Sequence, residues 1–245
     1  MTTKLFALSA MAAALAVSGC SSTSPTPPPE PSPLTYSALR ITPGGSTTQT
    51  GTGTIGGTPQ NATVQVGNAT YSFSGSGVPD DSVNGIDVYT YPSYRSGAAI
   101  LDGQYATAAL VSDNVVSQQS VAVLNGQATS PNSMPIQSAN YQGLWSIADS
   151  AGNSEGGQFA AGVNFDARTY GMDLYNGQGN IPLGTGSGVV QGTGFTGNLS
   201  TQGAFVSTNR VDGQFYGPGA AEMGGLIRGQ TASGATAGAL VGARQ

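Results

Sequence analysis

GQFYGPGAAEMGGLIRG, residues 213–229, is the most informative part of this 245-residue chain. Ahead of its central turn, Val211, Gly213 and Phe215 alternate with Asp212, Gln214 and Tyr216, which is the period of a β-strand with one buried face. The turn itself is Gly-Pro-Gly, in which proline fixes its own backbone and glycine adopts conformations that other residues resist. We therefore predict two strands joined by a sharp corner.

Short alternating segments surround this motif throughout the second half of the chain. They include Phe159 to Phe165, where every second residue is apolar, and a tight hairpin turn at Asp166 to Thr169. About eight strands are predicted after Asn140, at a spacing typical of a small antiparallel barrel or sandwich. Glycine, present 38 times, relieves crowding in strongly curved strands. Aromatic side chains are expected to fill the centre: Trp145, Phe159, Phe165 and Phe215.

The motif resembles the signature of the transferrin-binding-protein-like surface lipoproteins, whose relatives include factor H-binding protein and haem-carrier proteins. In that family the segment runs roughly aromatic-aromatic-Gly-Pro-x-Ala-x-Glu-aliphatic-Gly-Gly, and it closes a small eight-stranded barrel. The resemblance covers about residues 140–244 and implies a structural role for the matching residues. These are Phe215, Tyr216, Gly217, Pro218, Glu222, Gly224 and Gly225, with Met223 at the aliphatic position. Glu222 is expected to accept backbone N–H bonds at its bend, since buried acids need such partners.

We predict an all-β chain, in which a second β-rich region precedes the eight-stranded barrel. The expected parts are a signal peptide (1–19), a lipidated flexible tether (20–34), an N-terminal β-rich region (35–130) and the barrel (138–245). The boundary follows from the proline-containing segment between Gln127 and Ser138. In the N-terminal region, strands are expected at 63–66, 70–73, 86–91, 104–111 and 120–124, and glycine groups at 44–45, 51–53 and 56–57 are expected to form turns and loops.

The amino terminus has the layout of a bacterial lipoprotein signal. Lys4 is followed by an apolar run to Val17 and then by Ser18-Gly19-Cys20, which resembles a lipobox. Cys20 is the only cysteine, so it has no disulfide partner in the chain, and we expect a lipid such as palmitate on it. A proline- and serine-rich tether, residues 21–33, follows. Ser21, in place of an Asp, favours lipid anchoring at the outer membrane, facing the medium or the periplasm.

Composition excludes several function classes. Loss of Lys4 with the signal leaves six arginines against 12 acidic residues, so no nucleic-acid partner is expected. The absence of histidine excludes Ser-His-Asp triads, Cys-His pairs and histidine-based zinc sites. We predict a chain that is not an enzyme and has no cofactor or metal. The alternatives left open are carboxylate pairs for a glycosidase or calcium, and these involve Asp80, Asp81, Asp87, Asp149, Glu155, Asp166 and Asp173.

The leading functional prediction is a non-catalytic binding module. The resemblance implies a lipoprotein that captures an external protein or a haem-type ligand in iron or haem acquisition; a haem would need tyrosine or methionine ligands here. The best candidates for an aromatic contact patch are Tyr89, Tyr91 and Tyr94, expected to be exposed in DVYTYPSYR. Ordinary strand tyrosines remain the alternative reading of that segment. The alternative function is a structural lipoprotein that maintains the envelope without a soluble ligand.

Overall fold

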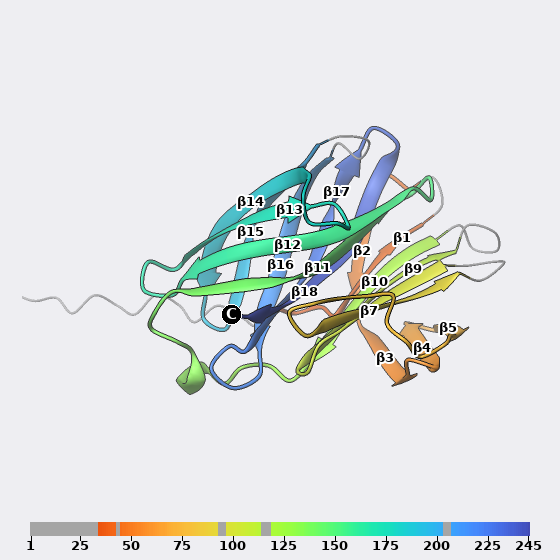
Figure 1. Ribbon diagram of the computed structural model, residues 1–245. Helices are drawn as coiled ribbons and strands as arrows, with labels where there is room; N and C mark the ends of the chain where they lie inside the picture. The colour runs from red at the N-terminus through yellow and green to blue at the C-terminus, as the bar shows by residue number, and fades with distance from the viewer. Residues whose placement is uncertain (1–33, 43–44, 93–96, 114–118, 203–206) are drawn as a thin grey trace, which may run out of the picture.

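A computed structural model describes residues 34–42, 45–92, 97–113, 119–202 and 207–245, and Figure 1 shows their arrangement. Within these ranges the chain forms β-strands β1 to β18 and one 3₁₀ helix, η1 (Pro131–Ser133). None of the described residues forms a helix that is long and apolar enough to cross a membrane. The predicted signal and residues 20–33 of the predicted tether, Cys20 included, lie outside the described residues, whereas Leu34, the last residue of that tether, packs against the core between the barrel and the N-terminal sheet.

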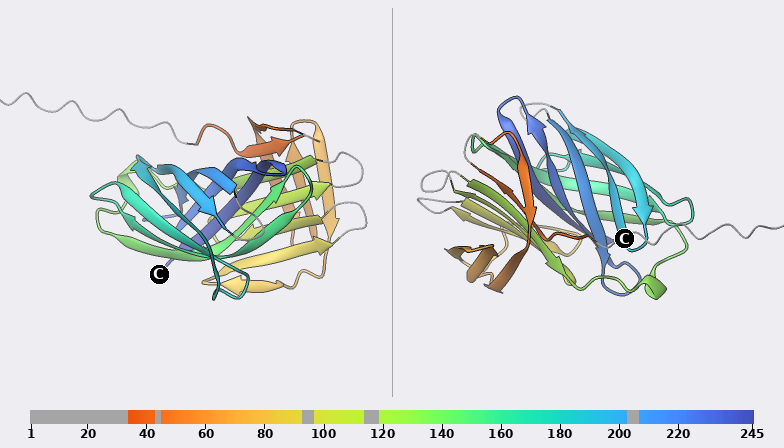
Figure 2. Two further views of the ribbon diagram at one scale, coloured as in Figure 1. Left: turned by 90° about the horizontal axis from the view of Figure 1, so that it is seen from above. Right: turned by 180° about the vertical axis from the view of Figure 1, so that it is seen from behind.

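The second half of the chain is a closed eight-stranded antiparallel barrel, which confirms the predicted fold class (Figures 1 and 2). Each strand pairs with the next, and the last pairs back to the first through Tyr141 opposite Arg244 and Asp149 opposite Thr236. The strands are β11 (Ala139–Asp149), β12 (Ser154–Asn164), β13 (Thr169–Tyr175), β14 (Pro182–Gln191), β15 (Gly194–Thr201), β16 (Ser207–Tyr216), β17 (Glu222–Thr231) and β18 (Gly234–Arg244).

Aromatic side chains fill the barrel interior. The ring of Phe215 lies at the centre of this group, with ring centroids 5.1 Å from Phe165, 5.4 Å from Phe195 and 5.9 Å from Tyr141. Trp145 is also buried, and its indole N–H lies 3.1 Å from the carbonyl oxygens of Gln158 and Tyr175. The predicted aromatic centre is confirmed, since Trp145, Phe159, Phe165 and Phe215 all belong to this core cluster.

The first half of the chain forms two further antiparallel sheets. The seven-stranded one, called here the N-terminal sheet, has the order β2-β1-β10-β9-β8-β7-β6, and the three-stranded one, called the small sheet, has the order β3-β4-β5. Their strands are β1 (Ala38–Ile41), β2 (Thr48–Gly51), β3 (Gly53–Thr58), β4 (Asn61–Val66), β5 (Ala69–Ser74), β6 (Asp81–Val83), β7 (Ile86–Pro92), β8 (Gly97–Asp102), β9 (Ala106–Asp113) and β10 (Gln119–Gly126).

The glycine-rich segment 51–57 does not form the turns that its composition predicts. It contains the end of β2 and most of β3, and Gly56 and Gly57 pair with Thr63 and Ala62 of β4. Gly57 has φ of +88°, and a Cβ on it would lie 2.0 Å from the carbonyl oxygen of Asn61. The prediction was wrong because these glycines satisfy a strand pairing at a close backbone approach, which sequence composition does not distinguish from a loop.

The N-terminal sheet packs against the outside of the barrel. On the barrel, Ala235, Ala237 and Ala239 of β18 point outward and are almost completely buried. On the sheet, the matching apolar side chains include Leu39 and Leu124, within one continuous core cluster. The alanines let the two surfaces approach closely over a wide area, and burial of this apolar area stabilises the pairing at roughly 25 cal/mol per Å².

This packing corrects the expectation of one buried face for residues 211–216. Val211, Gly213 and Phe215 face the barrel interior as predicted, but Gln214 and Tyr216 on the other face are buried too, with 8% and 4% of their surface exposed. Tyr216 belongs to the core cluster between the barrel and the N-terminal sheet. The second face is buried because another sheet covers it, and strand periodicity alone carries no information about that partner.

The corner between β16 and β17 contacts the N-terminal half of the chain. Gly217 has φ of +71°, and a Cβ there would lie 2.5 Å from the Tyr105 ring, so glycine is required on both counts. The hydroxyl of Thr129 donates to the Gly217 carbonyl oxygen at 2.8 Å, and that of Tyr141 donates to Ala220 at 2.7 Å. The corner is therefore held from both sides.

Glu222 joins the barrel to the N-terminal sheet. Its Oε1 accepts the backbone N–H of Gln104 at 2.7 Å, and its Oε2 accepts those of Tyr105 at 2.9 Å and Ala106 at 2.8 Å. Gln104 and Tyr105 belong to the turn between β8 and β9 and Ala106 is the first residue of β9, so the donors do not come from the bend beside Glu222 as the sequence suggested. Glu222 as a residue is 3% exposed, and a Cβ on Gly103 would lie 2.7 Å from its Oε2. The turn and the carboxylate thus fit closely together.

We predict that Glu222→Ala lowers the free energy of unfolding by about 2–4 kcal/mol, because it leaves three backbone N–H groups without an acceptor, that of Ala106 buried and those of Gln104 and Tyr105 partly buried. Glu222→Gln should also destabilise the protein, since an amide NH₂ would face one or more of these donors. The measurement is urea unfolding followed by tryptophan fluorescence. Asp173→Ala, which removes an exposed carboxylate of β13, is the matched control and should change stability little. Equal effects of the Glu222 and Asp173 variants would contradict the role given to Glu222.

Candidate functional site

The candidate site is a groove of about 240 Å³ between the small sheet and the N-terminal sheet, called here the tyrosine groove. It contains two of the three tyrosines that the sequence singled out and combines apolar walls with a few polar groups, as ligand sites do. The small sheet lies on the face of the N-terminal sheet that is turned away from the barrel (Figure 1), and the groove lies between these two sheets. Its lining residues are Ile55, Gly56, Gly57, Thr58, Pro59, Ala62, Tyr89, Tyr91, Ile100, Asp102, Thr107, Asn125 and Gly126.

Tyr91 forms part of the groove's floor. Its side chain is only 3% exposed, its ring centroid lies 5.6 Å from that of Phe73, and its hydroxyl donates to the Pro59 carbonyl oxygen at 2.7 Å. Burial raises the pKa of Tyr91, and nearby ionisable groups raise it further. The expectation that Tyr91 is exposed was wrong, because the small sheet packs over it. Tyr91 therefore contributes a fixed ring surface to the groove, and its hydroxyl is already bonded to Pro59.

Tyr89 stands at the side of the groove and is half-buried. Strand alternation places Asp87, Tyr89 and Tyr91 on one face of β7, and Asp87 pairs directly with Asp102 of β8. The Tyr89 hydroxyl lies 3.4 Å from Oδ2 of Asp87. Burial raises the pKa of Tyr89, and the charges of Asp87 and Asp102 raise it further. A tyrosine ring therefore lies next to two carboxylates.

Polar side chains fix the remaining wall. Asp102 accepts a hydrogen bond from the Thr107 hydroxyl at 2.7 Å. Asn125 bridges the two sheets, since its Oδ1 accepts the Ile55 N–H at 2.7 Å and its Nδ2 donates to the Gly53 carbonyl oxygen at 3.0 Å. Sequence reasoning missed Asp102 and Asn125. The available signal was a polar residue directly after an apolar run, Asp102 after Ile100-Leu101 and Asn125 after Val123-Leu124.

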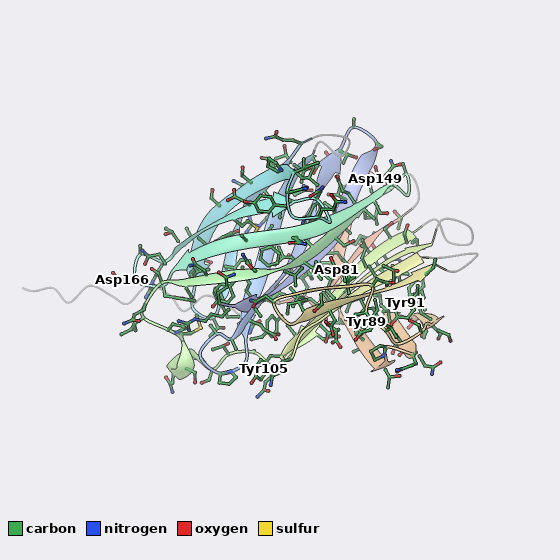
Figure 3. The ribbon with its side chains drawn as sticks, in the orientation of Figure 1. Asp81, Tyr89, Tyr91, Tyr105, Asp149 and Asp166 are labelled. Atoms are coloured by element: carbon green, nitrogen blue, oxygen red, sulfur yellow. The ribbon has the colours of Figure 1, made fainter. Side chains whose placement is uncertain are left out.

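The other predicted site residues do not converge on the groove. Tyr94 lies outside the described residues, and Figure 3 shows Asp149 and Asp166 at opposite ends of the barrel, away from Tyr89 and Tyr91. The motif residues lie in the barrel wall and at the corner, and Glu222 is occupied by its three backbone donors. In the part of the chain that the structure describes, no group of three or more Asp, Glu, His or Cys side chains gathers.

The carboxylates considered for catalysis have local structural partners or none. Asp149 accepts the N–H groups of Ala151 and Asn153 and the Ser233 hydroxyl. Burial alone would raise the pKa of Asp149, but these hydrogen bonds outweigh it and lower the pKa. Burial raises the pKa of Glu155, whose Oε2 has no hydrogen-bond partner. Asp166 and Asp173 are exposed at separate positions of the barrel.

A second polar cluster surrounds Asp212 on the outside of the barrel, beside a hollow of about 390 Å³. Its Oδ1 accepts the hydroxyl of Thr196 at 2.6 Å and Nε of Arg210 at 2.8 Å, and its Oδ2 accepts the hydroxyl of Tyr36 at 2.6 Å and Nη2 of Arg228 at 3.1 Å. The Arg228 guanidinium also lies over the Tyr36 ring, 5.6 Å from its centroid. The cluster holds the start of the described chain on the barrel.

The pKa of Asp212 follows from these contacts. Burial by itself would raise it, but hydrogen bonds from Thr196, Tyr36 and Arg210, together with the charge of Arg210, outweigh burial and lower the pKa to about 2. The ordinary value of an Asp in this chain is 3.8. The ionised form of Asp212 is therefore stabilised in the folded protein. We call this cluster the clasp, because its hydrogen bonds join Tyr36 near the start of the described chain to the barrel.

The barrel region matches one known protein family. Residues 134–245 match the family described as C-lobe and N-lobe β-barrels of Tf-binding protein B. A search of curated protein sequences gives no match.

Solved structures show the same fold over most of the chain. A mutant of the vaccine antigen Transferrin Binding Protein B from Haemophilus parasuis Hp5 aligns with a TM-score of 0.58 and 20% identity, covering 85% of this chain and 45% of that one. Intact Ap-TbpB, with its N and C lobes, aligns with a TM-score of 0.58 and 17% identity, covering 86% of this chain and 46% of that one. The isotype 1 Transferrin binding protein B from serogroup B Neisseria meningitidis aligns with a TM-score of 0.56 and 17% identity, covering 86% of this chain and 43% of that one. This chain therefore spans somewhat less than half the length of these proteins.

We predict that acid weakens the protein partly through Asp212. Because the folded pKa of about 2 lies below the ordinary 3.8, the unfolded state takes up the proton first as pH falls. The stabilisation, about 2 kcal/mol, is complete above the ordinary pKa and is lost as pH falls through about 2. In urea unfolding at pH 6 and pH 2, Asp212→Asn should remove this part of the pH dependence, whereas Asp173→Asn should retain it. An unchanged pH dependence in Asp212→Asn would refute the clasp.

Proposed function

Because residues 134–245 form a barrel of the transferrin-binding-protein-like family, we propose that this chain is a non-catalytic binding module that captures an external protein at the bacterial outer membrane. The observation that carries the proposal is the pairing of this barrel with a second sheet system, joined through Glu222 into one body. That body aligns with about half of Ap-TbpB, a protein with an N and a C lobe. The described part of this chain therefore has the size expected of one such lobe.

The surface outside the barrel supports a role in recognition. The barrel interior is filled by aromatic side chains, whereas the tyrosine groove opens on the opposite side of the N-terminal sheet with Tyr89 half-buried at its side. Aromatic side chains are enriched at protein interfaces because they offer a large contact area at low conformational cost. We propose the groove as part of the contact surface.

The ligand class follows from the relatives and from the composition. Transferrin is the first external protein to test, since the matched proteins carry it in their names. A role in iron acquisition belongs to the same proposal. A haem ligand would need tyrosine or methionine at the iron, because the chain has no histidine.

The membrane attachment is a further part of the proposal. Cys20 follows a signal-like segment, and the proline- and serine-rich residues 21–33 lie between it and the start of β1. A lipid on Cys20 would anchor the chain, and an extended tether at roughly 3 Å per residue would hold the folded part clear of the membrane surface.

The capture proposal predicts that the full-length lipoprotein, purified in detergent and immobilised, binds transferrin or another serum protein with a micromolar or lower dissociation constant. Interferometry with iron-loaded transferrin, apotransferrin and pooled serum fractions measures this, with serum albumin as the control. Surface display is tested in parallel by proteolysis of intact cells, with a periplasmic protein as the integrity control. Complete protection from protease together with no bound serum protein would favour the alternative, a structural lipoprotein of the envelope.

The anchor is tested separately through its attachment residue. Cys20→Ala should abolish incorporation of a fatty-acid analogue and release the protein from the membrane fraction, because no other cysteine is present. Ser21→Ala, one residue further along, should be labelled like the parent chain. Labelling that persists in Cys20→Ala would disprove the lipid attachment.

A further inference from the structure

Asp102 lines the tyrosine groove, Asp87 lies beside it on the neighbouring strand, and no described residue neutralises either carboxylate. Asp87 and Asp102 lie directly opposite each other on β7 and β8, so their side chains share one face of the sheet. Like charges in opposed positions destabilise a sheet unless something compensates for them. Both ion pairs that involve described residues are made by Asp212, with Arg210 and Arg228. The pair on the groove is thus available to a cation from outside.

The walls around this pair suit the stem of a long side chain. Ile55 and Ile100 provide apolar surface, and the half-buried Tyr89 provides an aromatic ring beside the carboxylates. Arginine and lysine bury their methylene stems against apolar surface while the charged end reaches a polar partner. Aromatic faces add a cation–π attraction, which is stronger at a partly desolvated position.

The size of the groove argues against a cofactor. A volume of about 240 Å³ lies below the roughly 300–1,000 Å³ typical of small-molecule and cofactor pockets. Hydrogen bonds also fix its walls, through the Tyr91 hydroxyl on Pro59 and through Asn125 between the two sheets. A preformed groove of this size suits one inserted side chain at the centre of a protein interface, where buried anchors contribute most of the binding energy.

We propose that the tyrosine groove binds a cationic side chain of the captured partner, with arginine preferred over lysine. This inference rests on the proposed capture function and adds the chemistry of its contact. The planar guanidinium can donate to both Asp87 and Asp102 while its stem lies against Tyr89 and Ile100. Lysine, a single ammonium on a flexible stem, meets the same charges with less geometric match.

The test uses a defined probe on the full-length lipoprotein in detergent. N-acetyl-L-arginine methylamide should bind with a millimolar dissociation constant and shift the NMR resonances of Tyr89, and the neutral analogue N-acetyl-L-citrulline methylamide should not. Asp102→Asn and Asp87→Asn should each weaken the arginine probe about 5- to 10-fold, the second variant serving if loss of the Thr107 bond disturbs the fold. Tyr89→Phe should retain binding, and Tyr89→Leu should weaken it. Asp173→Asn is the matched control and should bind like the parent.

Three results would overturn the inference. These are equal binding of arginine and citrulline probes, unchanged binding in both aspartate variants, and binding of calcium at Tyr89 without any response to the arginine probe. The two proposals fail separately. If Asp87→Asn and Asp102→Asn lose the probe but capture the serum protein like the parent, the groove is not the contact and capture stands. If the parent binds the probe but no external protein, capture fails and the groove chemistry stands.

Discussion

The carboxylate of Glu222 is the contact on which the arrangement of this protein depends. It accepts two backbone N–H groups from the turn between β8 and β9 and one from the first residue of β9, and so connects residues more than 100 positions apart in the sequence. A buried carboxylate without such donors would be strongly destabilising, and the turn would be left with unsatisfied N–H groups. Each side therefore requires the other, and the distance between the barrel and the N-terminal sheet is fixed as a result.

The Gly-Pro-Gly corner and nearby glycines let the barrel and the N-terminal half of the chain approach closely around this contact. Gly217 admits the Tyr105 ring, Gly224 leaves room for Leu124 and Tyr216, and Gly103 leaves room for the carboxylate itself. The alanines of β18 continue the same surface. Small residues on the outside of a barrel usually expose backbone to water, but here they form a flat surface on which a second sheet packs. The high glycine content thus serves the interface as well as the curvature of the barrel.

The sequence predicted the barrel better than the region before it, for a physical reason. Barrel strands such as β12 bury one face against a single interior, so their period of two is visible in the residues themselves. The glycine and threonine residues of β3 pair with β4 without an alternation of apolar and polar residues. Tyr91 is buried by the small sheet, and the alternation within its own strand does not reveal that partner. The role of Glu222 as an acceptor of backbone N–H groups could be anticipated, but the turn that donates them could not. Such partners are set by tertiary packing.

The packing of the barrel and the N-terminal sheet determines which surfaces stay accessible to the proposed partner. The barrel interior is occupied by the rings around Phe215, and its outer face at β17 and β18 is covered by the N-terminal sheet. That sheet is therefore buried on the barrel side, and its other face carries the small sheet and the tyrosine groove. In the proposed capture, a partner that enters the groove would contact β7, β8 and the small sheet, and Glu222 joins the closed barrel to the turn between β8 and β9. In the proposed capture, the barrel would contribute to binding by holding the groove in shape, since a preformed contact surface loses less conformational entropy on association.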